Sequence, residues 1–168
     1  KVLPTSTLKK KWDSICETHK DYVTQQRCLE GMGQLMKLYQ WAENEGLLIV
    51  DMNIPYQMAI NGPHGVVDFK GEIGVLATNK TGQMELLVTD FSNRYPDQAM
   101  LDMKLKFSLD SYALNKVYNK SIGIRIHNVK NNKDFYSYRI KDDYVRLENT
   151  ISNVAFCIEN NIIYPRES

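Results

Sequence analysis

Two aspartates are the residues of this sequence whose type and position could do chemistry. Asp68 closes the run Gly65-Val66-Val67, and Asp90 closes the run Leu86-Leu87-Val88-Thr89, with 21 residues between them. An aspartate in an apolar strand is costly to bury alone, so it caps a turn, pairs with a base or binds a metal. Two such acids that converge across a hairpin would make a site for Mg²⁺ or Mn²⁺. The alternative is that both acids only close a polar network.

The elements that must position these acids are short strands. After Gly46 the sequence changes from helical spacing to short apolar runs that are broken by glycine and proline. This pattern predicts a β-meander with turns at residues 61–63 and 79–82. The expected strands lie at residues 47–52, 56–60, 65–69, 73–77 and 85–91.

Helical spacing predicts the remaining elements. Leu8, Trp12 and Cys16 follow one another at steps of four, and the apolar residues between 28 and 39 keep the same periodicity before Gly46 stops the helix. The expected helices lie at residues 5–20, 21–45, 96–118 and 142–159, and further strands lie at 122–129 and 135–140. The order predicts an α/β fold with a mixed β-sheet flanked by helices, in which the helix after Phe91 joins two parallel strands.

The helix at 96–118 should place Met100, Met103, Phe107 and Leu114 against the sheet. Lys104 and Lys106 are two positions apart and cannot both face the same way, so at most one of them can approach the two acids.

Composition is that of an ordinary globular domain. The chain has 168 residues, 43% hydrophobic and 24% charged, and a net charge of +1. We expect a single domain spanning residues 1–168, with any nucleic-acid surface confined to local basic clusters. It begins at Lys1 without a methionine, which suggests a fragment of a longer protein. The three cysteines form no CxxC pair, which predicts buried free thiols in a reducing, intracellular compartment. No apolar run is long enough for a membrane span.

The segments around the two acids resemble the RecB-like branch of the PD-(D/E)XK nucleases. That branch reads G-x-x-D, then apolar-apolar-D-[YF]-K, then a helix with Q-x-x-x-Y. The matching segments are Gly65-Val66-Val67-Asp68, Leu86 to Ser92, and the stretch from Ser108 to Tyr112. The similarity extends from Pro55-Tyr56 to residues 159–165, and it implies a restriction-endonuclease-like core with two N-terminal helices.

The resemblance implies a role for each matching residue. Asp68 and Asp90 would bind Mg²⁺ or Mn²⁺, the carbonyl of Phe91 would be a further ligand, and Tyr112 would be the helix tyrosine. The metal would polarise the scissile phosphate, and a lysine would stabilise the developing charge.

This sequence departs from the family pattern at the lysine. Ser92 stands in its place and offers only a neutral hydrogen bond. Ser108 replaces the motif glutamine, and Met36 and Lys37 stand near the position of the first-helix histidine. The expected function is therefore a DNA-binding nuclease-fold domain with impaired catalysis.

Three alternatives stay open. Lys104 or Lys106 could supply a displaced lysine, or Lys70 could do so with Asp51 as the upstream acid; either would make the chain an active metal-dependent nuclease. The third is a non-catalytic, partner-binding subunit of a phage or bacterial replication, repair or transcription assembly.

Two other groups of residues could contribute to binding. Tyr136, Tyr138, Arg139 and Lys141 alternate, so that one face of the segment could stack on bases, but we expect an amphipathic edge strand instead. His19, His64 and His127 are scattered without metal-ligand spacing, and we expect ordinary surface or packed imidazoles.

Overall fold

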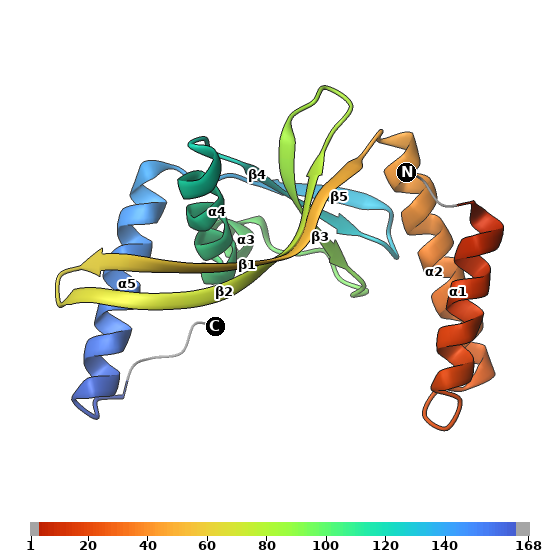
Figure 1. Ribbon diagram of the computed structural model, residues 1–168, viewed down its shortest axis with the longest axis horizontal. Coiled ribbons are helices and arrows are strands. Elements are labelled where there is room, and N and C mark those ends of the chain that lie inside the picture. The colour runs from red at the N-terminus through yellow and green to blue at the C-terminus, as the bar shows by residue number, and fades with distance from the viewer. Residues whose placement is uncertain (1–3, 164–168) are drawn as a thin grey trace.

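The computed structural model describes residues 4–163 and has an α/β fold, a five-stranded mixed sheet flanked by helices (Figure 1). The elements in chain order are α1 (Thr5–Thr18), α2 (Gln25–Asn44), β1 (Leu48–Gly62), β2 (Gly65–Thr78), β3 (Met84–Asp90), α3 (Gln98–Met103), α4 (Leu105–Tyr118), β4 (Gly123–Asn128), β5 (Lys133–Ser137) and α5 (Lys141–Glu159). No helix among these residues is long and apolar enough to cross a membrane.

The strands follow one another across the sheet in the order β1-β2-β3-β4-β5. Neighbours are antiparallel except β3 and β4, which are parallel and are joined through α3 and α4. The predicted meander and the predicted parallel pair are both confirmed. The parallel pair brings the carboxyl ends of β3 and β4 to the same edge of the sheet, with Asp90 opposite Asn128.

The first part of the meander differs from the prediction. Four expected short strands are two long ones, because neither Pro55 nor Gly71 interrupts the chain. β1 is an edge strand, where proline needs no ladder partner for its missing N–H. Gly71 lies opposite Tyr56, and a Cβ at Gly71 would collide with the tyrosine ring, so glycine there makes room for an aromatic neighbour. The irregularity in β1 lies earlier, as a register shift between Ile49 and Asp51.

The predicted helix at 96–118 is divided at Lys104, whose ψ of 120° is extended rather than helical. Arg139 stabilises this break, because its Nη2 donates to the carbonyls of Leu101 (2.9 Å) and Lys104 (3.2 Å). The break changes the helical phase. Phe107 and Leu114 are buried as expected, but the expectation that Met100 and Met103 face the sheet is wrong, since both are more than half exposed. The prediction that these four side chains face the sheet is therefore correct only for the two residues on α4.

The two faces of the sheet are covered differently. α4 and α5 cover the apolar face, where Ile60, Ile73, Leu86, Ile124 and Leu147 are almost fully buried. On β4 the isoleucines alternate with Arg125 and His127, which are buried toward the carboxyl end of α2.

The α1 and α2 pair extends from the end of the molecule opposite α5 (Figure 1). The two helices are fastened by Trp12, whose Nε1 donates to the carbonyl of Cys28 at 2.8 Å and whose ring occupies the space left by Gly31. All three cysteines are free thiols, but they are partly exposed and not buried as the sequence predicts.

Candidate functional site

Asp90 is the last residue of β3 and lies at the carboxyl edge of the parallel strand pair. Its Oδ1 accepts from the backbone N–H of Ser92 (2.9 Å), and its Oδ2 accepts from Nδ2 of Asn128 (3.1 Å). The Ser92 hydroxyl lies 3.0 Å from Oδ2 and 3.0 Å from the carbonyl of Arg94, and with one proton it donates to one of them at a time. The Asp90 carboxylate thus stabilises the turn that follows β3 and links this turn to β4.

These contacts leave little of the carboxylate for a metal. A carboxylate offers about four lone-pair sites, and up to three of them are taken by protein donors. Partial burial raises the pKa of Asp90, but the bonds from Ser92 and Asn128 and the positive charge of Lys104 lower it by more, so the net shift is downward. Asp90 is therefore a stable anion that already has its partners.

Asp68 does not lie beside Asp90. β2 and β3 pair only from Leu76↔Leu86 to Thr78↔Met84. Continuing this register would place Glu72, and not Asp68, opposite Asp90. Asp68 lies four residues further along β2, about 13 Å at the usual rise per residue. It pairs with Ala59 in the β1–β2 hairpin, whose tip contacts α5 through a hydrogen bond from His64 N to Ser152 Oγ (2.9 Å). The expectation that Asp68 and Asp90 share one cation is wrong for this register.

The other residues that the resemblance singles out are exposed or form contacts within the fold. The ring of Phe91 is exposed. The hydroxyl of Tyr112 donates to Glu148 of α5 at 2.9 Å, and burial together with Glu148 raises its pKa to about 12, so it links two helices as a neutral donor. Ser108 accepts from Nε of Arg139 at 2.8 Å and helps to hold the break before α4.

The candidate lysines lie in three different places. Lys104 is exposed at the start of α4, and its charge acts on Asp90. Lys106 is engaged elsewhere, because its Nζ donates to Asp110 (2.6 Å) and to the carbonyl of Glu72 (2.7 Å). Lys70 lies opposite Gln57, and Gln57 is six residues from Asp51 along β1. Lys70 and Asp51 are therefore not brought together, and Lys104 is the one of these lysines whose charge acts on Asp90.

Basic side chains surround the Asp90 edge of the sheet. Lys133 is opposite Asn128 in the ladder, and Asn128 is opposite Asp90, so the three residues form one row across β5, β4 and β3. Arg94 and Lys104 are exposed on the segments that follow β3, and Lys130 is exposed in the turn after β4. We call Arg94, Lys104, Lys130 and Lys133 the basic rim.

The acids near the basic rim are engaged in internal contacts. Asp97 accepts from the N–H of Ala99 at the start of α3, and Asp102 accepts from Ser137 and Gln98. Asp134 lies 2.6 Å from His127 and 3.4 Å from Arg125. The four basic side chains of the rim are exposed, so they remain available to an anionic partner on a chain of almost balanced charge.

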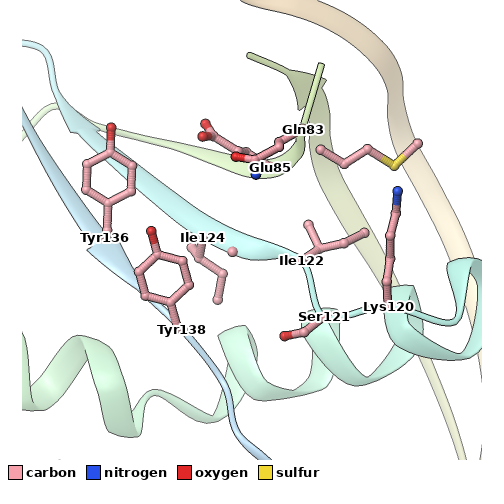
Figure 2. A pocket seen from close by; sticks show the side chains of 10 residues that line it. Gln83, Glu85, Lys120, Ser121, Ile122, Ile124, Tyr136 and Tyr138 are labelled. Carbon is pink, nitrogen blue, oxygen red and sulfur yellow. The ribbon is translucent and has the colours of Figure 1, made fainter. Parts of the chain in front are cut away.

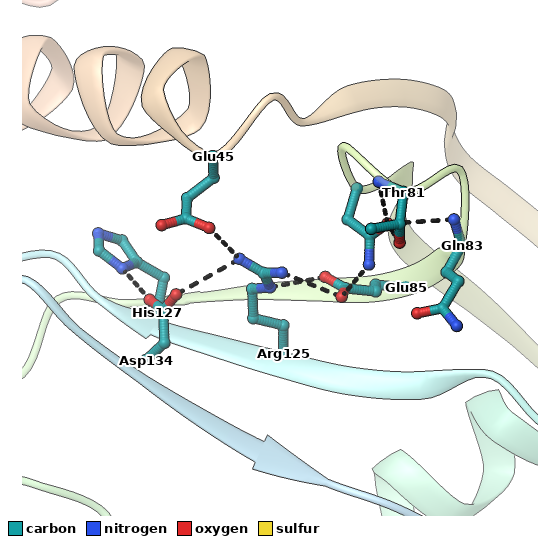
Figure 3. Close-up of polar contacts among 8 residues, drawn as sticks. Glu45, Thr81, Gln83, Glu85, Arg125, His127 and Asp134 are labelled. Atoms are coloured by element: carbon teal, nitrogen blue, oxygen red, sulfur yellow. Dashed lines mark hydrogen bonds and ion pairs between the residues drawn. The ribbon is translucent and has the colours of Figure 1, made fainter.

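A buried charged cluster, which the sequence pattern did not predict, lies on the other face of β4 (Figure 3). Arg125 donates from Nη2 to Glu85 Oε1 (3.0 Å) and holds Nε 2.6 Å from Oε2, and it also contacts Glu45 (3.2 Å) and Asp134 (3.4 Å). Burial lowers the pKa of Arg125, but Glu85 raises it by more, so the net shift is upward. The alternation of Arg125 and His127 with isoleucines was the available signal for this cluster.

His127 belongs to the same cluster. Its ring stacks on Trp41 with centroids 3.7 Å apart, and its Nδ1 lies 2.6 Å from Asp134. Its Nε2 has no hydrogen-bond partner in the part of the chain that the structure describes. His127 is thus a packed imidazole, as expected, and it joins the carboxyl end of α2 to β4.

Tyr136 and Tyr138 are both exposed, but the alternative of an alternating basic face is not present. Arg139 is buried and bonds to Ser108 and to the carbonyls at the α3–α4 break. Within residues 4–163, no group of three or more histidine, cysteine, aspartate or glutamate side chains is placed to hold a metal ion.

Comparison with known proteins adds little to this geometry. No family model matches the chain, and no curated protein sequence matches it. The chain is similar to the solved structure described as "Crystal structure of SSO0001", with 12% identity, a TM-score of 0.46, and coverage of 97% of this chain and 73% of that chain. A likeness of this size supports no argument about function.

Proposed function

We propose that this chain is a nucleic-acid-binding domain with a PD-(D/E)XK-type core in which metal-dependent cleavage has been lost. The observation that carries the proposal is the bonding of Asp90. The residue in the position of the motif lysine, Ser92, contributes its N–H and its hydroxyl to the Asp90 carboxylate instead of a charge to a substrate. Asn128 takes part of the remaining capacity.

The sheet supports the same proposal. A meander that leads into a parallel β3/β4 pair, with helices between and an acid at the carboxyl end of β3, agrees with the arrangement that the sequence resemblance implies. Ligands of open α/β sheets commonly bind outside the carboxyl ends of the parallel strands. Asp68, the second acid that the resemblance implies, lies in the β1–β2 hairpin instead of at this edge.

The basic rim supplies the binding surface in this proposal. Arg94, Lys104, Lys130 and Lys133 are exposed around the same edge, and lysine and arginine contacts to phosphates provide most of the affinity for nucleic acid that does not depend on sequence. We propose DNA as the partner, bound through its phosphates. Binding of this kind needs no metal and leaves the strand intact.

One observation favours a second candidate, an active nuclease with Lys104 as a displaced lysine. The charge of Lys104 acts on Asp90, whereas that of Lys106 is committed to Asp110. In this alternative, Lys104 would stabilise the charge that develops on the phosphate, and a divalent cation would bind the free lone pair of Asp90 together with substrate oxygens.

A cleavage assay separates the two candidates. Labelled single-stranded and duplex DNA are incubated with the chain in Mg²⁺ or Mn²⁺, beside Asp90→Asn, Lys104→Ala and Ser92→Lys. The proposal predicts no cutting by the natural chain. It also predicts none by Ser92→Lys, because Asp68, the second acid of the motif, lies in the β1–β2 hairpin, and the Asp90 carboxylate keeps its bonds to the backbone N–H of residue 92 and to Asn128. Cutting by the natural chain that Asp90→Asn and Lys104→Ala both abolish would replace the proposal with the displaced-lysine nuclease.

Calorimetry with Mn²⁺ provides a readout that does not depend on activity. The proposal predicts no stoichiometric heat of binding, and the same result for Asp68→Asn. A one-site isotherm lost in both Asp68→Asn and Asp90→Asn would contradict the structural separation of these acids.

A further inference from the structure

A cavity of about 380 Å³ lies at the opposite end of the parallel strands from Asp90. It is lined by the beginnings of β3 and β4 and by the tyrosines at the end of β5, among them Glu85, Gly123 and Tyr138 (Figure 2). Glu85 and Asp90 are five residues apart on one strand, or about 17 Å. The cavity is therefore a different site from the basic rim.

One side of the cavity is aromatic. Tyr138 lies over the bare backbone of Gly123, where a Cβ would stand 2.7 Å from the ring carbon Cε1. Tyr138 is nevertheless 66% exposed, so much of its ring remains accessible to a ligand. The neighbouring ring of Tyr136 is held by the guanidinium of Arg125, 5.2 Å from its centroid. Two rings that are already positioned need little ordering when a flat molecule binds.

The rest of the lining is polar and carries both signs of charge. Figure 2 shows Lys120 on the side of the cavity away from the tyrosines, with Gln83 and Glu85 between. Lys120 is exposed and has no ion pair within residues 4–163. Glu85 is fixed by Arg125 and Asn79, and Gln83 offers an amide donor and acceptor. These groups match a planar ring with hydrogen-bonding edges and an attached anion.

We propose that this cavity binds one unstacked nucleobase, with the base against the exposed part of the Tyr138 ring and its phosphate toward Lys120. The volume lies at the lower end of the range for small-molecule sites, so it suits one nucleotide and excludes a base pair within a duplex. Aromatic rings bind bases of any sequence through their faces. The nucleotide can be free or part of a single strand, and this site does not depend on the function proposed for the basic rim.

Calorimetry with two probes tests the proposal. The probes are AMP and a single-stranded thymidine octanucleotide, titrated into the full chain and into Tyr138→Ala, Lys120→Gln and Gly123→Ala. Tyr138→Ala should weaken binding by about tenfold or more, the loss expected for one base stack. Gly123→Ala keeps the tyrosine but pushes its ring out of place, and it should weaken binding in the same direction.

Tyr22→Ala is the matched control, because this tyrosine is 86% exposed in the turn between α1 and α2. Binding of AMP that requires Tyr138 identifies a mononucleotide site, and binding of the octanucleotide alone that requires Tyr138 identifies a site for a strand. Circular dichroism verifies that each variant is folded. The proposal is overturned if neither probe binds, or if folded Tyr138→Ala and Tyr22→Ala bind both probes as the natural chain does. Neither result bears on the function proposed for the basic rim, because that surface is tested with its own variants.

Discussion

Arg125 is the residue whose replacement should destabilise the protein most clearly. We consider Arg125→Met, which keeps a long side chain but removes the charge. The Arg125 side chain is 5% exposed, and its partner Glu85 is 13% exposed, so the pair is shielded from water. Without Arg125, the carboxylate of Glu85 would keep only the amide of Asn79, and Asp134 would keep only His127.

The expected cost follows from this burial. Removing one partner of a buried ion pair leaves an uncompensated charge and commonly costs about 3–5 kcal/mol. Small domains are stable by about 5–15 kcal/mol, so Arg125→Met should remove a large part of the free energy of unfolding. The double change Arg125→Met with Glu85→Gln removes the stranded charge and should recover part of the loss.

Urea unfolding followed by circular dichroism measures the effect. The midpoint should fall with little change in slope. Lys20→Met is the matched control, because Lys20 forms an ion pair with Glu17 in which both side chains are about two-thirds or more exposed, and it should leave the midpoint unchanged. A loss below about 1 kcal/mol for Arg125→Met would refute the assignment of this cluster as a buried electrostatic link between α2 and the sheet.

Two further predictions concern stability. The pKa of Asp90 is lowered in the folded protein, so its bonds contribute stability that is present above pH of about 4 and is lost as the pH falls through the folded pKa. Asp90→Asn should therefore reduce the loss of stability at acid pH, measured as urea midpoints in a pH series. Gly62→Ala should destabilise the protein by about 1–3 kcal/mol, because a Cβ there would collide with Ser152 and the Glu148 carbonyl of α5. Gly33→Ala, in open space on α2, should stabilise the protein by up to about 1 kcal/mol. Equal thermal midpoints for these two variants would contradict the packing described.

The sequence predicted the elements whose cause is local. The spacing of apolar residues predicted α2 and the parallel β3/β4 pair, since helical periodicity and a crossover helix are readable along the chain. The glycine and proline between the apolar runs predict strand breaks, but Pro55 and Gly71 lie inside the continuous strands β1 and β2. Their tolerance depends on β1 being an edge strand and on the ring of Tyr56 lying across from Gly71, which are facts of the neighbouring strand.

The candidate site was predictable in part for the same reason. An acid at the end of an apolar strand is visible in the sequence, and Asp90 lies there. The distance between Asp68 and Asp90 is not visible, because it depends on how far the long β1–β2 hairpin extends past the last β2/β3 pair. The Arg125 cluster needed partners from α2, β3 and β5, which no local pattern relates to one another.

The most direct test of the account is the salt dependence of DNA binding, measured by fluorescence anisotropy of a labelled duplex in EDTA. The account predicts that the natural chain binds and that a triple change of Arg94, Lys104 and Lys133 to alanine lowers the slope of log K against log salt by about 2–3, as expected for three lost phosphate contacts. The matched control replaces three exposed lysines of α1, Lys9, Lys10 and Lys11, and should keep the natural slope. Equal slopes for the two triple variants, or no binding by the natural chain at low salt, would contradict the assignment of the basic rim as a nucleic-acid surface.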